Sequence, residues 1–271
     1  MSLRQKVKRL MRIHEVSPRK RMGQNFMIDQ DVLQLMLSHA AITPSDMVLE
    51  IGAGFGFLTH LLAQKSKTVV AVEADTRLMQ VLHRELGHLG NVDLIGGDIL
   101  EVPLPTFNKV VSNPPFSISA PLLFWLLDKA FDCAVLTLQK EFARRLDAGI
   151  GSKDYSRLTV STYYRARIEL LDEVPKEAFY PQPDVDATIV RLKPRGAPPF
   201  YVKDEKIFNA VLRALFTQRN KKFRNALQSL SHKNEFKYKA LSKKTENLCL
   251  HQKRVRNFAP EDFGAVANAL S

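Results

Sequence analysis

Four consecutive residues, Asn113-Pro114-Pro115-Phe116, indicate the most specific chemistry in this sequence. The amide oxygen of Asn113 and the carbonyl oxygen of Pro114 can each accept one hydrogen bond from an –NH2 group attached to a flat ring. Proline has no N–H group and stiffens the loop, and Phe116 offers a face on which such a ring can stack. A plain Asn-Pro turn would be the favoured interpretation if this stretch stood alone.

An upstream glycine-rich segment and two acids favour a nucleotide-like ligand beside these residues. An apolar run over residues 47–51 leads into Gly52 and Gly54, which allow a sharp turn and a close approach of the backbone to a ligand. Glu73 lies 21 residues after Gly52 and ends a second apolar run, where a carboxylate can accept both hydroxyl groups of a ribose. Asp98 follows a third run and can accept a hydrogen bond from an adenine amino group.

These residues do not select the cofactor by themselves, because NAD, FAD and S-adenosylmethionine all contain adenosine. The amine-accepting stretch at residues 113–116 favours S-adenosylmethionine. The sequence therefore predicts methyl transfer to an exocyclic amine. It predicts no metal site, since neither the seven His nor the two Cys have the spacing of metal ligands.

The periodicity of the apolar residues predicts the elements that position these groups. Strand-like runs alternate with helical patterns, which predicts a parallel sheet with helices on both faces. The functional residues then follow the carboxyl ends of strands, where open α/β sheets bind ligands. The expected strands cover residues 47–51, 69–74, 92–95, 109–112 and 133–138, and the expected helices cover residues 29–40, 57–65, 76–87, 119–130 and 139–148.

The second half of the sequence has a different pattern. Two β-like stretches, Leu158–Leu171 and Asp186–Leu192, are expected to form an antiparallel hairpin at the edge of the sheet. A proline-rich linker over Lys193–Pro199 precedes helical periodicity. We therefore expect a basic N-terminal arm, a methyltransferase domain and a helical RNA-binding domain, at residues 1–24, 25–195 and 200–271.

Composition and charge favour a polyanionic partner and no membrane. The net charge of +12 is concentrated at the two ends: residues 1–24 carry +7, residues 200–271 carry +9 and the middle carries −4. Such basic ends are typical of nucleic-acid binding, although acidic membranes also attract them. No apolar run approaches the length of a membrane span. Two cysteines without a disulfide pattern favour a reduced, cytoplasmic location.

Seven segments, in order and over nearly the whole chain, resemble those of one family. They are Arg21–Met27, Glu50–Gly54, Gln139–Leu146, Tyr155–Leu158, Phe179–Asp186, Phe216–Lys222 and Arg256–Phe263. By these segments the chain resembles the KsgA family of small-subunit ribosomal RNA adenine dimethyltransferases. The family usually has Asn-Leu-Pro-Tyr where this chain has Asn113-Pro114-Pro115-Phe116. The form found here also resembles DNA adenine and protein glutamine N-methyltransferases.

The resemblance implies an α/β fold, with a Rossmann-like S-adenosylmethionine-dependent methyltransferase sheet and a small C-terminal helical domain. It implies dimethylation of N6 of two adjacent adenosines near the 3′ end of small-subunit rRNA, during ribosome biogenesis. The partner would be the rRNA or a precursor of the small subunit, and the enzyme would be a monomer off the ribosome. A non-catalytic assembly factor that binds RNA, or an enzyme acting on DNA adenine or protein glutamine, remains the alternative.

The expected site residues fall into three groups. The catalytic group is Asn113, Pro114, Phe116 and Phe179. Phe179 is either a hydrophobic plug or a residue that stacks on the second face of the base, and the resemblance favours stacking. The cofactor group is Gly52, Gly54, Glu73 and Asp98, to which the resemblance adds Asn25, Met27 and Asn113. The RNA-binding group, which helical spacing would place on one helix, is Arg219, Lys221, Lys222 and Arg224.

Overall fold

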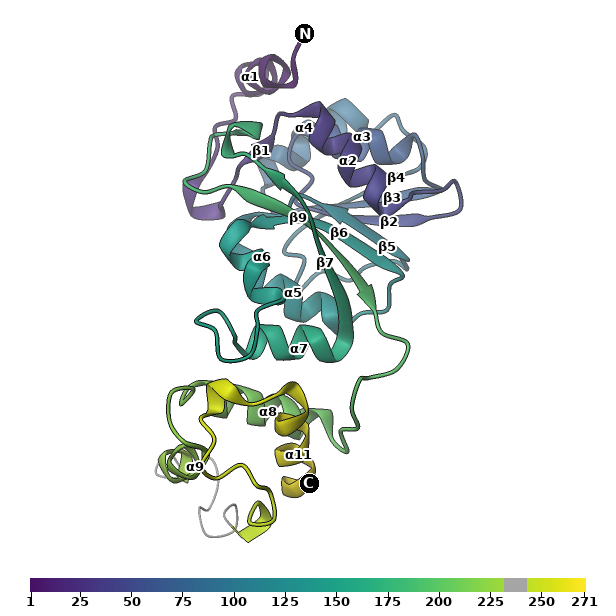
Figure 1. Cartoon of the computed structure of the whole chain (residues 1–271). Coiled ribbons are helices and arrows are strands. Elements are labelled where there is room, and N and C mark those ends of the chain that lie inside the picture. Colours follow the sequence, from purple (N-terminus) through teal and green to yellow (C-terminus); the bar gives the residue numbers. More distant parts are fainter. Residues whose placement is uncertain (232–242) are drawn as a thin grey trace. The chain divides into compact units, whose positions relative to one another are not determined.

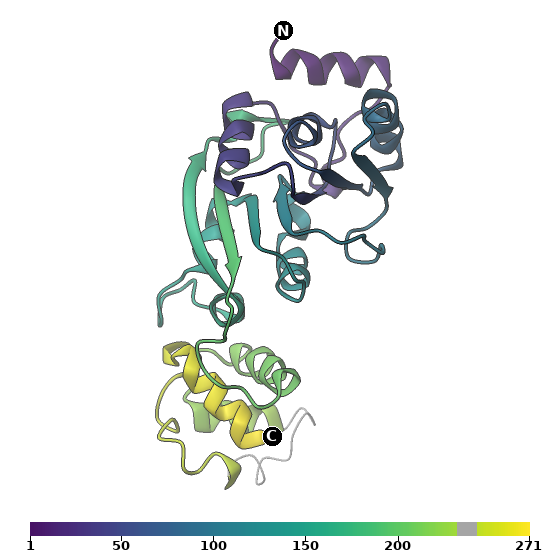
Figure 2. The same cartoon turned by 90° about the vertical axis from the view of Figure 1, so that its right-hand side faces the viewer.

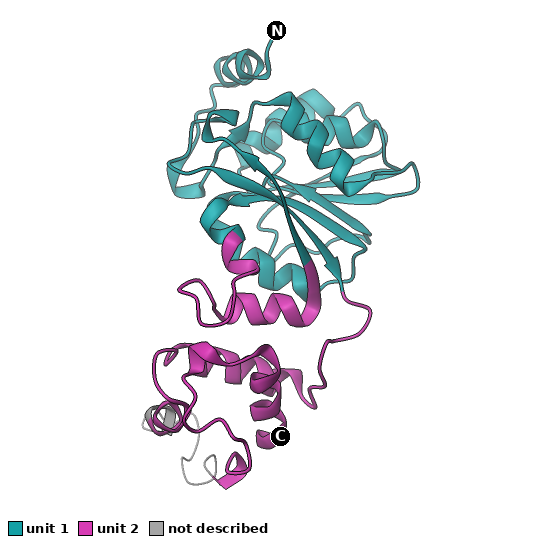
Figure 3. Cartoon of the chain, in the orientation of Figure 1, with its two compact units in different colours: residues 1–143, 168–194 teal, residues 144–167, 195–271 magenta. Residues whose placement is uncertain are grey.

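The computed structural model describes residues 1–231 and 243–271, which form two compact units (Figure 3). Unit 1 comprises residues 1–143 and 168–194, and unit 2 comprises residues 144–167 and 195–271. The expected arm, methyltransferase domain and helical domain are functional divisions, and their boundaries stay a prediction.

A mixed seven-stranded sheet forms the centre of unit 1 (Figure 1). Its strands are β2 (Met47–Ile51), β3 (Thr68–Glu73), β4 (Val92–Gly96), β5 (Lys109–Ser112), β6 (Cys133–Gln139), β7 (Ala166–Val174) and β9 (Ala187–Pro194). They are arranged in the order β4-β3-β2-β5-β6-β9-β7. Strands β2 to β6 are parallel to one another, and β9 is antiparallel to β6. The predicted parallel sheet is confirmed.

Helices cover both faces of this sheet. They are α2 (Gln30–Ala40), α3 (Phe57–Ala63), α4 (Thr76–Leu86), α5 (Ser119–Leu127) and α6 (Lys140–Leu146), close to the predicted bounds. In Figures 1 and 2, α2, α3 and α4 lie on one face and α5 lies on the other. The carboxylate of Asp29 begins α2 by accepting hydrogen bonds from the N–H groups of Asp31 and Val32.

Two short segments and an N-terminal helix complete unit 1. β1 (Phe26–Met27) pairs antiparallel with β8 (Phe179–Tyr180), so two motifs more than 150 residues apart lie side by side. The basic N-terminal segment forms α1 (Leu3–Ile13), in which Ser2 and Gln5 form a reciprocal cap. Part of the expected basic arm is therefore a helix.

The expected strand over Leu158–Leu171 is wrong in its first half, because residues 157–165 form α7 (Arg157–Arg165). The hydroxyl of Thr159 accepts a hydrogen bond from the N–H of Ser156 at 3.0 Å and so starts a helix. The Leu, Val and Thr side chains that suggested a strand are buried in this helix. Tertiary burial outweighs β-propensity here. β7 starts directly after α7 and lies next to β9, as the expected hairpin requires.

Unit 2 combines α7 with α8 (Glu205–Phe216), α9 (Phe223–Ser231) and α11 (Pro260–Leu270). Its core is rich in aromatic side chains, including Tyr155, Phe208, Phe223, Phe258 and Phe263. The hydroxyl of Tyr155 donates a hydrogen bond of 2.8 Å to the carbonyl oxygen of Phe258. This buried bond ties the Tyr155–Leu158 motif to the C-terminal motif within the same unit.

Candidate active site

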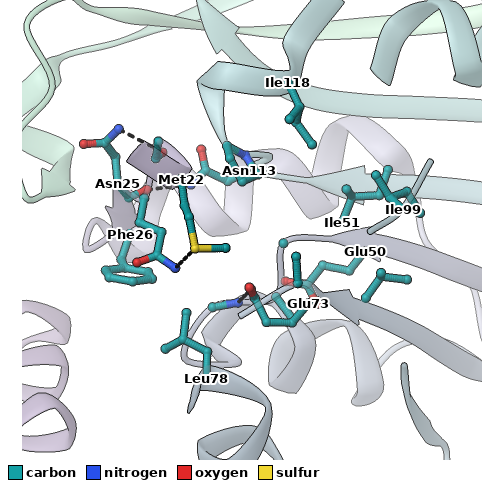
Figure 4. A pocket seen from close by; sticks show the side chains of 18 of the residues that line it. Met22, Asn25, Phe26, Glu50, Ile51, Glu73, Leu78, Ile99, Asn113 and Ile118 are labelled. Carbon is teal, nitrogen blue, oxygen red and sulfur yellow. Dashed lines mark hydrogen bonds between the residues drawn. The ribbon is translucent and has the colours of Figure 1, made fainter. Parts of the chain in front are cut away.

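The carboxyl ends of four adjacent parallel strands form the wall of a pocket in unit 1 (Figure 4). Gly52 follows β2, Glu73 ends β3, Asp98 follows β4 and Asn113 follows β5. All four residues line the pocket, together with Asn25, Met27 and Gly54. The structure thus brings together every residue of the expected cofactor group.

The glycine loop is shaped by close contacts with the segments around it. Gly52 has a φ of 75°, and a Cβ atom on it would lie 2.9 Å from Cδ of Pro115. Gly54 has a φ of 60°, and a Cβ atom there would lie 3.1 Å from the ring of Phe26. A larger residue at either position would be strained and would push against the wall of the pocket. The loop therefore lies directly against the Asn113–Phe116 stretch.

Glu73 is held in a fixed orientation by backbone groups. Its Oε2 accepts a hydrogen bond from the N–H of Gly54, and its Oε1 accepts one from the N–H of Asp75, both at 2.9 Å. Burial raises the pKa of Glu73. An ionised carboxylate has about four acceptor positions, so each oxygen retains capacity for one further donor. This geometry suits a vicinal diol such as a ribose.

A hydrogen-bonded network that includes the pocket-lining residue Gln24 supports the Glu73 end of the pocket. Nε2 of Gln24 donates a hydrogen bond of 3.0 Å to Asp75, and Oε1 of Gln24 accepts one of 2.8 Å from the N–H of Arg19. Arg77 also pairs with Asp75 at 2.6 Å. Although burial alone would raise it, the hydrogen bonds from Arg77 and Gln24 lower the pKa of Asp75 to about 2. Gln24 therefore connects the Arg21–Met27 motif to β3.

Glu50 is a pocket-lining acid that the sequence reasoning missed. Only 2% of this residue is exposed, and its Oε2 has no hydrogen-bond partner among the described residues. Burial, and secondarily the nearby charge of Glu73, raises the pKa of Glu50 to about 8. In Figure 4 the two acids lie together on one side of the pocket. An acid inside the buried run of residues 47–51, just before the glycines, was the available signal.

Asn113 presents a polarised amide to the pocket. Its Nδ2 donates a hydrogen bond of 3.1 Å to the carbonyl oxygen of Asn25. Its Oδ1 is buried and has no partner among the residues that the structure describes. A buried acceptor without a donor is costly, so this oxygen is suited to a ligand that carries an N–H group.

The other expected catalytic residues lie beside this pocket rather than on its lining, which includes Pro115 and Ile118. Pro114 is buried. The ring of Phe116 meets the ring of Phe179 edge to face, with centroids 5.9 Å apart, and only 1% of Phe179 is exposed. β8 brings Phe179 to this position. The catalytic roles of Pro114, Phe116 and Phe179 stay predictions.

The expected RNA-binding residues lie in unit 2, and one structural expectation about them is wrong. Arg219, Lys221 and Lys222 lie on the connection between α8 and α9, not on a helix; Arg224 lies on α9. The guanidinium of Arg219 donates hydrogen bonds to the carbonyl oxygens of Ser152 and Lys153, at 2.8 and 2.9 Å. The backbone pairing of Lys222 with Arg254 explains the loop, because this pairing requires a non-helical backbone. Their role in RNA binding stays a prediction.

A seven-stranded sheet of this order, with an adenosine-type pocket at its carboxyl edge, defines a Rossmann-like methyltransferase. Residues 16–270 match the family described as ribosomal RNA adenine dimethylase. The chain therefore belongs to this family of rRNA adenine dimethyltransferases, and the resemblance read from its motifs is confirmed.

Curated relatives agree over most of their length. A protein of Methanosarcina acetivorans, named probable ribosomal RNA small subunit methyltransferase A, is 44% identical over 249 residues, which are 91% of each chain. A protein of the same name from Methanopyrus kandleri is 45% identical over 218 residues, covering 80% of this chain and 78% of the relative.

Two solved structures share the fold. A dimethyladenosine transferase from Plasmodium falciparum aligns with a TM-score of 0.77 and 31% identity, covering 89% of this chain and 95% of that one. The 23S rRNA methyltransferase ErmE aligns with a TM-score of 0.65 and 25% identity, covering 91% and 99%. In the part of the chain that the structure describes, no helix is long and apolar enough to cross a membrane.

Proposed function

We propose that this protein dimethylates N6 of two adjacent adenosines near the 3′ end of small-subunit rRNA, with S-adenosylmethionine as the methyl donor, during ribosome biogenesis in the cytoplasm. The observation that carries the proposal is the unpartnered Oδ1 of Asn113, next to the glycine loop and the acids of the adenosine-type pocket. The names of the relatives support the small-subunit rRNA as substrate.

The pocket residues fit the cofactor. Glu73 can accept hydrogen bonds from the two ribose hydroxyls. Asp98 follows the neighbouring strand β4, where its carboxylate can accept a hydrogen bond from the adenine amino group. The shape of the glycine loop depends on its glycines, because a Cβ atom at Gly52 or Gly54 would crowd Pro115 or Phe26 in the wall of the pocket. When bound, S-adenosylmethionine supplies a methyl group that is already activated by its sulfonium.

The protein must then make a poor nucleophile reactive. The lone pair of an adenine N6 is delocalised into the ring. Acceptors at Asn113 Oδ1 and at the carbonyl of Pro114, placed out of the ring plane, would favour a pyramidal nitrogen and localise this lone pair. Positioning in line with the methyl group supplies much of the remaining acceleration. No strong general base is required, since the methylated nitrogen is acidic enough to lose its proton to solvent.

The target base must leave its stack, which costs least in a single-stranded loop. We propose that Phe116 and Phe179 flank the extruded base, which requires Phe179 to become accessible. Arg219, Lys221, Lys222 and Arg224 would bind phosphates of the RNA. The partner would be rRNA or a precursor of the small subunit, bound by a monomer.

The decisive experiment uses small-subunit particles that lack the modification. The particles are incubated with the full-length protein and labelled S-adenosylmethionine, and the labelled nucleotides are mapped. We expect two adjacent dimethyladenosines near the 3′ end of the rRNA. Asn113→Ala should abolish most of the transfer while RNA affinity, which comes mainly from phosphates, stays near that of the wild type.

Each competing function has its own outcome in this experiment. Binding of the particle without any label would favour a non-catalytic assembly factor. Label in DNA or in protein glutamine, offered in parallel reactions, would favour the other N-methyltransferase classes. Near-normal dimethylation by Asn113→Ala would refute the role assigned to this side chain.

A further inference from the structure

The N-terminal helix α1 has two chemically different sides. Leu3 and Val7 are buried, and Leu10 and Met11 are partly buried, so one side of the helix is apolar. All five cations of the helix are exposed. We call them the basic face of α1: Arg4, Lys6, Lys8, Arg9 and Arg12. Figures 1 and 2 both show α1 lying across one end of unit 1.

The apolar side of α1 packs onto residues that also form the cofactor pocket. Val7 and Val16 belong to one buried cluster with Phe26, Phe55 and Leu78. The last three residues line the pocket, and the rings of Phe26 and Phe55 meet edge to face with centroids 4.7 Å apart. One side of each of these side chains therefore faces the ligand, while the cluster that supports it includes α1. Protein interiors are close-packed, so removing this support shifts the wall.

Additional contacts fix the helix to the motif that carries Phe179. The guanidinium of Arg4 and the ammonium of Lys8 lie 5.8 and 5.6 Å from the centre of the Tyr180 ring. Such cation–π contacts are attractive. Tyr180 is paired with Phe26 through the strands β8 and β1. Helix α1 thus touches both strands that enclose this side of the site.

The basic face is not neutralised within the helix. Residues 3–13 contain five cations and no acid, and among the described residues no ion pair involves any of them. Arg4, Lys8 and Arg12 are spaced four residues apart, where like charges repel each other. A polyanion would relieve this repulsion and match the face in charge. Lys6 and Arg9 also border a groove with an apolar floor that includes Phe55 and Phe57.

We infer that α1 is a shared element of the cofactor site and the RNA interface: its apolar side supports the wall of the cofactor pocket, and its basic face binds the phosphate backbone of the RNA substrate. The family match begins at residue 16, so α1 lies outside it. The inference rests on the proposed function, since it requires an adenosine-type cofactor and an RNA substrate.

The supporting role of α1 is tested by calorimetry with S-adenosylhomocysteine and the full-length chain. Val7→Asp places a charge on the buried side of the helix, and Ile13→Asp places the same charge at a position that is 54% exposed. We expect Val7→Asp to weaken binding at least about tenfold, a typical size for coupling between packed sites, and Ile13→Asp to change it less than about twofold. If Val7→Asp does not fold, the milder variant Val7→Ala replaces it in the assay. We expect Val7→Ala to weaken binding by a factor between those expected for Ile13→Asp and Val7→Asp.

Two results distinguish failure of this inference from failure of the proposed function. If the wild type does not bind S-adenosylhomocysteine, the proposed function fails. If the wild type binds and the folded Val7 variants bind equally well, only the role of α1 in the pocket is overturned. Fluorescence of Trp125, the single tryptophan of the chain and a residue of unit 1, verifies that each variant is folded.

The RNA role of the basic face is tested by replacing Lys6, Arg9 and Arg12 with Gln, which leaves the Tyr180 contacts in place. Binding to the small-subunit particle is titrated at several salt concentrations. We expect the slope of log affinity against log salt to fall by about 2 to 3, since each of the three lost phosphate contacts removes roughly 0.7 to 0.9. The affinity for S-adenosylhomocysteine should be unchanged. An unchanged slope would overturn the RNA assignment. Binding to phosphatidylglycerol vesicles is measured in parallel, and a variant that loses binding to the vesicles but keeps binding to the particle would also overturn the RNA assignment.

Discussion

Replacement of the buried acid by its amide, Glu50→Gln, should make unit 1 less sensitive to rising pH. In the native state burial raises the pKa of Glu50 to about 8, whereas its ordinary value is 4.5. Between these two values the native state binds one more proton than the unfolded state. The free energy of unfolding therefore falls with pH in this window, by about 1.4 kcal/mol per pH unit. Stability from this group is fully present below pH 4.5 and is lost as the pH rises towards 8.

The size of the effect follows from the same two pKa values. Most of the window lies between pH 5 and pH 7, and over this interval the wild type should lose about 2.5 kcal/mol that Glu50→Gln does not lose. The NH2 group of the amide can take the position of Glu50 Oε2, which has no hydrogen-bond partner among the described residues. A buried donor left without a partner there costs about 1–3 kcal/mol. That cost does not depend on pH, so the difference between the two pH values isolates the proton linkage.

Urea unfolding followed by Trp125 fluorescence measures this difference, because Trp125 lies on α5 in unit 1. The wild type and Glu50→Gln are compared from pH 5 to pH 8. Asp93→Asn, which changes an exposed acid of β4 in the same sheet, is the matched control and should keep the pH profile of the wild type. Parallel profiles for the wild type and Glu50→Gln would refute the assignment of a protonated, buried carboxyl at Glu50.

Three further outcomes are expected. Glu73→Ala should weaken binding of S-adenosylhomocysteine at least about tenfold, because two ribose hydroxyls lose a charged acceptor; calorimetry measures this, and binding of NAD instead would contradict the cofactor assignment. Gln24→Ala should give a smaller loss in the same assay, since its hydrogen bonds connect this pocket-lining residue to Glu73 through Asp75, and a loss larger than that of Glu73→Ala would refute this indirect role. Replacing three cations of the loop between α8 and α9 with Gln, namely Arg219, Lys221 and Lys222, should lower the salt slope of particle binding by about 2 to 3 and leave cofactor affinity unchanged. An unchanged slope would remove this loop from the RNA interface.

The sequence was sufficient to predict the sheet and the clustering of the expected cofactor residues at one edge of it, for a physical reason. Parallel strands in α/β proteins place their carboxyl ends along one edge. The expected site residues Gly52, Glu73 and Asn113 stand at or directly after the ends of three such strands, so they had to lie along this edge. The same rule explains why Asp98, in a connection without further motif, was also found.

Features that depend on contacts between distant segments could not be predicted in this way. The run Leu158–Leu171 has strand propensity, yet burial against the rest of unit 2 makes its first half helical. Arg219 was assigned to a helix because only the spacing of cations was visible; its bonds to Ser152 and Lys153 form between segments more than 60 residues apart. Glu50 was overlooked because periodicity shows that a position is buried but not which atoms of the buried side chain lack a hydrogen-bond partner.

The orientation of the Asn113 amide is the clearest case of chemistry that only the fold determines. An asparagine can present either its oxygen or its NH2 group to a ligand. The carbonyl oxygen of Asn25, 88 residues away, can only accept a hydrogen bond, so it takes the Nδ2 group of Asn113 and leaves Oδ1 as the free acceptor. The reversed amide would set two acceptors against each other at Asn25 and present a donor to the donor hydrogens of an amine. The Arg21–Met27 segment therefore does more than line the pocket, because it fixes the amide polarity that the role proposed for Asn113 requires.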